Sequence, residues 1–176
     1  MRTTMHRYAW AAAVLLAVSA GAAALRITED PPDLQQQLTS RMRTTLEEAD
    51  PATHQHAGHA LPQSQAMVCG VRVYGYEPAD VTALADVRTV YGFHMCGVAE
   101  PLKPWDVAVK LAGPVILTMS TDPPGIEVVE ASEDVKFVDR LQQMFPEPYA
   151  RLAMTEALSE AEMTDLRGRY DAAAGL

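Results

Sequence analysis

The stretch that decides the fold reads MVCGVRVYGY over residues 67–76, and a second apolar stretch reads VRTVYGFHMCGV over residues 87–98. Both are rich in Val, Tyr and Phe, the residue types that are enriched in strands. The residues between them begin with Glu-Pro-Ala-Asp at positions 77–80, a composition typical of a turn. We therefore predict two antiparallel strands joined by a short connection.

Paired residue numbers in an antiparallel hairpin have a constant sum, so one pair defines the whole register. Pairing Cys69 with Cys96 places the centre of the hairpin near residue 82, inside the connection, and puts both cysteines on one face. Because export favours disulfides, we expect these two residues to be bonded if the chain is exported. The other expected pairs are Val71 with His94, Val73 with Gly92, Tyr74 with Tyr91 and Gly75 with Val90.

The same register places four aromatic side chains on the face opposite the disulfide. An aromatic surface of this size is either covered by other elements or used as a binding face. Cover by C-terminal helices is the favoured interpretation, and an aromatic binding face is the alternative. The four residues are Tyr74, Tyr76, Tyr91 and Phe93.

The rest of the chain beyond residue 67 predicts more strands and then helices. Strands are expected at 105–111, 114–120 and 126–129, with a break at 113–114, where the sequence is Gly-Pro. Helices are expected at 132–144 and 149–158, and a third should begin at Ser159, where Glu162 completes a capping box. This order predicts an α+β domain over 67–176, with an antiparallel sheet of four to five strands backed by C-terminal helices.

The first 26 residues predict a signal peptide or a membrane anchor helix. Arg2 and Arg7 precede an apolar run at 8–25, and its end at 19–24 consists of small residues. A helix of that length spans roughly 27 Å at 1.5 Å per residue, close to the thickness of a bilayer core. Both a cleaved signal and one retained transmembrane helix remain open. Either places the later domain outside the cytoplasm, secreted or anchored, as in a bacterial envelope protein.

Residues 27–66 predict a polar helix followed by a flexible linker. The helix should cover 31–48 with Asp33 as its N-cap, and one apolar residue recurs every fourth position from Leu34 to Leu46. That narrow stripe suits a stalk, a coiled-coil partner or a helix lying across the main domain. Residues 49–66 contain few large apolar side chains, which favours a linker.

Three histidines in this linker, His54, His56 and His59, are the candidate metal ligands. Neutral imidazole binds Zn, Cu or Ni, but no further ligand follows at a set spacing. A plain linker is the favoured interpretation, a weak or functional metal site is the alternative, and no cofactor is expected.

Beyond residue 26 the chain carries 11 basic and 23 acidic residues. Such an acidic body is repelled by phosphates, which argues against a nucleic-acid partner. Common hydrolase, zinc-protease and nucleotide-binding motifs are absent, and acidic residues at predicted helix starts complement the helix dipole. We therefore expect a non-enzymatic extracytoplasmic binding module with a protein or small-molecule partner. A small exported enzyme and a metal-binding envelope protein are the alternatives.

Four short segments carry a resemblance to a known group. They read VRTVYGFHMC at 87–96, LAGPV at 111–115, DPP at 122–124 and FPE at 145–147. Their layout, over residues 67–152, resembles that of small exported bacterial proteins of uncharacterised activity. The resemblance implies an exported unit of sheet and helices and no catalytic role.

Overall fold

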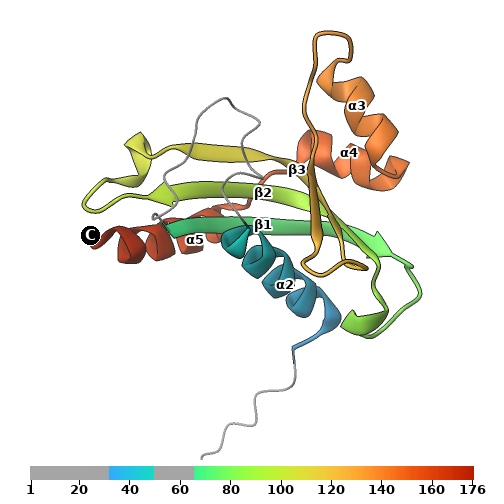
Figure 1. Ribbon diagram of the computed structural model, residues 1–176, viewed down its shortest axis with the longest axis horizontal. Helices are drawn as coiled ribbons and strands as arrows, with labels where there is room; N and C mark the ends of the chain where they lie inside the picture. The colour runs from blue at the N-terminus through green and yellow to red at the C-terminus, as the bar shows by residue number, and fades with distance from the viewer. Residues whose placement is uncertain (1–31, 50–65) are drawn as a thin grey trace, which may run out of the picture. The chain divides into compact units, whose positions relative to one another are not determined.

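The computed structural model describes residues 32–49 and 66–176 (Figure 1). The predicted leader at 1–26, the linker and its three histidines lie outside the described residues. Within the described part, no helix is both long and apolar enough to cross a membrane.

The core element is an antiparallel sheet of four strands in the order β1-β2-β3-β4. The strands are β1 (Ala66–Glu77), β2 (Thr89–Ala99), β3 (Lys110–Thr118) and β4 (Gly125–Val128). Neighbours in sequence are therefore neighbours in the sheet, as short connections favour. With the helices described below, this sheet confirms the α+β class.

The expected break at Gly113 and Pro114 is wrong, because β3 runs through both residues. Residues 105–111 do not form a separate strand, since Trp105–Val107 is a short 3₁₀ helix, η3. The carbonyl of Pro114 accepts the N–H of Val129, so the backbone of Pro114 faces the β4 side. Its nitrogen therefore points away from β2, and the missing N–H removes no bond between β2 and β3.

The predicted register of the first hairpin is confirmed from Cys69 to Val73 and is wrong after it. Val73 pairs with Gly92 as expected, but the register then shifts and Gly75 pairs with Tyr91. The extra residue, Tyr74, forms a β-bulge, which changes the face on which later side chains lie. Tyr76 consequently joins the disulfide face instead of the opposite one.

Helix α2 (Leu34–Glu48) is confirmed, with Asp33 accepting a hydrogen bond from the backbone N–H of Gln36. Most of its apolar stripe is buried, because Leu38, Met42 and Leu46 are 0% exposed in the same cluster as the disulfide, and Leu34 packs against that cluster partly buried. The compact unit extends over Pro32–Leu176. Of the three roles left open for this helix, the structure shows the last, a helix lying across the main domain.

The C-terminal helices are α3 (Phe137–Met144), α4 (Glu147–Thr155) and α5 (Glu160–Ala174). The capping box at Ser159 and Glu162 is confirmed. The expected start of the first helix at Ser132 is wrong. Its hydroxyl accepts the N–H of Val135, as an N-cap would, but its own N–H donates to the carbonyl of Val135 and closes a separate turn. Local hydrogen bonds of this kind compete with helix formation, and α3 begins five residues later.

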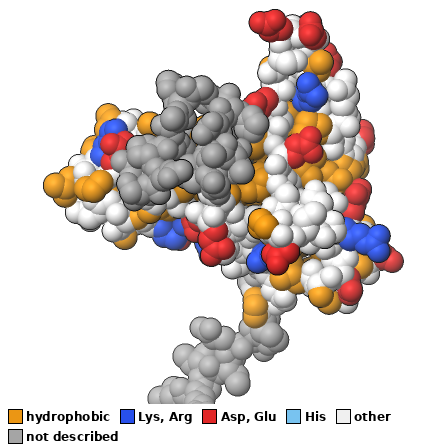
Figure 2. Space-filling view, in the orientation of Figure 1, with side chains coloured by type: hydrophobic (Ala, Val, Ile, Leu, Met, Phe, Trp, Pro, Cys, Tyr) orange, Lys and Arg blue, Asp and Glu red, His pale blue; other side chains and the backbone are white. Residues whose placement is uncertain are grey.

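Helices cover both faces of the sheet. On the disulfide face, α2 packs against Val71, Val90 and Leu117. On the other face, Leu166 and Tyr170 of α5 pack near the start of β1, while α3 and α4 lie toward the opposite end (Figure 1). Figure 2 shows acidic side chains scattered over one side of the molecule, with fewer basic ones among them.

Candidate functional site

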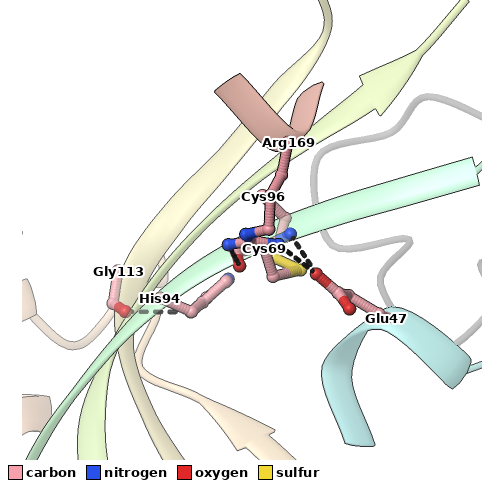
Figure 3. Close-up of a disulfide and its surroundings, with 6 residues drawn as sticks. All are labelled: Glu47, Cys69, His94, Cys96, Gly113 and Arg169. Carbon is pink, nitrogen blue, oxygen red and sulfur yellow. Dashed lines mark hydrogen bonds and ion pairs between the residues drawn. A yellow bond between two sulfur atoms is a disulfide. The ribbon is translucent and has the colours of Figure 1, made fainter. Parts of the chain in front are cut away.

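The disulfide joins Cys69 of β1 to Cys96 of β2, as the register predicted (Figure 3). The two residues are 0% and 2% exposed, and their Cα atoms lie 4.0 Å apart. A short Cα separation is typical of an antiparallel pair whose backbone groups point away from each other. The bond therefore lies in the core, between the sheet and α2.

The backbone groups of Cys69 that face the open edge of the sheet bind two charged residues, Glu47 of α2 and Arg169 of α5. Glu47 Oε1 accepts the N–H of Cys69 at 2.9 Å, and Arg169 Nη2 donates to the carbonyl of Cys69 at 2.6 Å. Arg169 Nη1 lies 2.9 Å from Glu47 Oε1, which closes the triangle (Figure 3). We call Glu47, Cys69 and Arg169 the edge latch. It occupies backbone groups at the edge of the sheet that could otherwise pair with another strand.

A second ionic cluster joins the opposite face of β1 to the start of α5. Arg72 Nη2 lies 2.6 Å from Glu162 Oε2, and Arg72 Nη1 lies 3.1 Å from Glu156. The hydrogen bond to Glu162 raises the pKa of Arg72. Partial burial favours the neutral form of Glu162, but hydrogen bonds from Arg72 and Ser159 outweigh it and lower the pKa of this carboxyl. Both partners therefore stay charged, and the cluster is a structural clamp.

His94 is 2% exposed and lies on the disulfide face of β2. Its Nδ1 is 2.9 Å from the carbonyl of Gly113 on the neighbouring strand (Figure 3). The side chain is therefore bound to the neighbouring strand of the sheet.

The four predicted aromatic residues do not share one surface. The ring centroid of Tyr91 lies 5.2 Å from that of Phe145 and 5.3 Å from that of Tyr149. Tyr74 belongs to the same cluster. Burial raises the pKa of Tyr91 to about 12, and a hydrogen bond to Glu77 adds to the effect. Phe93 is half-buried, and Tyr76 lies across the sheet. Helices thus cover the centre of the proposed aromatic face.

A pocket of about 490 Å³ lies between α2 and the turn that joins β3 to β4. Its helix wall is formed by Arg41, Thr45, Glu48 and Ala49, and its other wall by residues 122–126. We call this the α2–turn pocket. Its volume is in the range typical of small-molecule sites.

Thr45 of the helix wall carries a buried hydroxyl that is unpaired among the described residues. The residue is 8% exposed, and its Oγ1 has no hydrogen-bond partner in the part of the chain that the structure describes. Buried polar atoms are nearly always hydrogen-bonded, so an exception needs an explanation. Sequence analysis missed this site because its two walls are far apart in the chain. The only local signal is the polar stripe of Arg41, Thr45 and Glu48 along one side of α2.

The predicted metal ligands His54, His56 and His59 lie outside the described residues, so the metal site stays a prediction. Within residues 32–49 and 66–176, no group of three or more His, Cys, Asp or Glu side chains is arranged to hold a metal ion. Comparison of the chain with protein-family models, with curated proteins and with solved structures gave no match.

Proposed function

We propose that this chain is an extracytoplasmic, non-enzymatic binding module that holds a small ligand in the α2–turn pocket. The observation that carries the proposal is a pocket of ligand size whose helix wall presents Arg41 and Glu48, neither of which forms an ion pair among the residues that the structure describes. A preformed pocket with few polar groups is the usual form of a binding site.

The extracytoplasmic location rests on other observations. The buried disulfide supports an oxidising compartment, where such bonds form and persist. The basic, apolar and small-residue pattern at 1–26 supports delivery across a membrane.

The location is tested by fractionating cells that produce the chain with a C-terminal tag. We expect the protein in the extracytoplasmic or membrane fraction, with Cys69 and Cys96 protected from alkylation until a reductant is added. Recovery from the cytoplasm with two free thiols would refute the extracytoplasmic part of the proposal. The N-terminal residue of the recovered protein would also show whether the leader is cleaved.

Ligand binding is tested by thermal shift of the oxidised full chain against a library of small metabolites. A ligand of the α2–turn pocket should raise the Tm of the native protein but have much less effect on an Arg41→Gln/Glu48→Gln variant. Arg43→Gln is the matched control, because Arg43 lies on the same helix outside this pocket. Shifts that persist equally in all three proteins would place binding elsewhere and overturn the proposed site.

A further inference from the structure

We propose that the α2–turn pocket takes a zwitterion the size of a dipeptide, with its carboxylate at Arg41 and its ammonium group at Glu48. This inference rests on the proposed binding function and names the chemical class of its ligand.

The two charges stand at the ends of one helical stripe. Arg41, Thr45 and Glu48 are separated by four and three residues, so they share one side of α2. The helix rises 1.5 Å per residue, which puts the Cα atoms of Arg41 and Glu48 roughly 10 Å apart. A cationic group therefore lies at one end of the helix wall of the pocket and an anionic group at the other.

Neither charge has an ion-pair partner among the residues that the structure describes, in contrast to their neighbour on the helix. Glu47 is bound to Arg169 in the edge latch, whereas Glu48 and Arg41 form no described salt bridge. Asp122, on the turn wall of the pocket, is likewise without one. The charges that line the pocket therefore remain available to a ligand.

The electrostatics of α2 assign the two ends of that ligand. Glu48 lies in the last turn of the helix, where the macrodipole is negative and no basic residue occurs. A bound ammonium group would offset both the carboxylate and the dipole. Arg41 offers a planar guanidinium, which matches a carboxylate through two parallel hydrogen bonds.

The length and walls of the pocket favour two linked residues over one amino acid. Two extended residues span at most about 7 Å, so a dipeptide with one contact at each end matches helix positions roughly 10 Å apart. Pro123, Pro124 and Ile126 offer an apolar wall for an aliphatic side chain of the ligand.

Isothermal titration of the oxidised full chain with three probes tests this assignment. The probes are the dipeptide Ala-Leu, its N-acetylated form and its C-terminal amide. Ala-Leu should bind saturably, and each blocked form should bind about ten-fold more weakly, the effect of losing roughly one charge-assisted contact. No saturable binding of Ala-Leu, or equal binding of all three probes, would overturn the zwitterion.

Variants assign each end of the ligand separately. Arg41→Gln should bind Ala-Leu and its amide equally, and Glu48→Gln should bind Ala-Leu and its acetylated form equally. Arg43→Gln should keep both differences. Circular dichroism checks that both variants are folded. If folded Arg41→Gln and Glu48→Gln still bind Ala-Leu more tightly than both blocked forms, the proposed orientation is refuted.

If other ligands shift the Tm through Arg41 and Glu48 while Ala-Leu does not bind, the dipeptide assignment fails and the proposed binding function stands.

Discussion

The burial of α2 makes a prediction that separates a core helix from a stalk. Leu38 is 0% exposed and lies in one cluster with Met42, Leu46 and the disulfide. A helix that only tethered the domain would leave this side chain in water. Replacing Leu38 with Ala therefore measures whether α2 is part of the folded unit.

The expected loss follows from complete burial. Truncating a fully buried leucine removes the transfer energy of three carbon atoms and leaves a cavity, and the two effects together cost about 3 kcal/mol. Domains of this size unfold with free energies of about 5–15 kcal/mol, so one such change is a large fraction of the total. Changes at Leu38 and Met42 together should not add simply, since both line the same cluster.

Urea denaturation of the oxidised protein, followed by far-ultraviolet circular dichroism, provides the measurement. Ser40→Ala is the matched control, because Ser40 is exposed on the same helix. We expect Leu38→Ala to lower the free energy of unfolding by about 3 kcal/mol and Ser40→Ala to change it by less than about 0.5 kcal/mol. Equal, small effects of the two substitutions would refute the core role of α2.

Three further predictions concern the sheet. Reducing the disulfide, which closes a separation of 27 residues, should lower the free energy of unfolding by about 3.5 kcal/mol in urea titrations; an unchanged midpoint would contradict this. Gly92→Ala should cost about 1–3 kcal/mol, because its Cβ would lie 2.4 Å from the backbone oxygen of Arg72. Gly168→Ala, in α5 with nothing within 4 Å of its Cβ, should instead stabilise by about 0.5–1 kcal/mol, and the same sign for both would refute the packing argument. Burial and the Glu77 hydrogen bond raise the pKa of Tyr91 to about 12 in the folded protein, whereas an unfolded tyrosine titrates near 10. Unfolding then releases a proton between these values, so stability should fall from pH 10 to 12, and Tyr91→Phe should show a smaller fall across that interval.

The register of the first hairpin could be predicted only in part from the sequence. Pairing Cys69 with Cys96 gave the correct register as far as Val73, because paired residue numbers keep a constant sum until a bulge intervenes. The pattern did not predict the bulge at Tyr74. Whether a bulge forms depends on which side chains pack against each face of the sheet. Here Gly75 lies against the ring of Tyr149, a residue of helix α4, which is distant in the sequence.

In strand β3, the sequence predicted an irregularity that the structure does not have. Gly113 and Pro114 have the composition of a break, yet the strand continues through them. The penalty of proline in a sheet depends on the side to which its nitrogen faces. The side to which the nitrogen of Pro114 faces depends on how β3 pairs with its neighbours. Residues 113–114 alone do not reveal that pairing.

By itself, the sequence determined the α+β class, the strands of the first hairpin, the disulfide pair and the caps at Asp33 and Ser159. These features arise from interactions between residues that are near in the chain or joined by one short connection. Only the tertiary structure decided that α2 belongs to the core and that Thr45 lies in a pocket beside the turn at 122–126. The apolar stripe of α2 would suit any apolar surface equally well. The packing of all the elements decides which surface α2 contacts. It also decides where a pocket remains beside the helix.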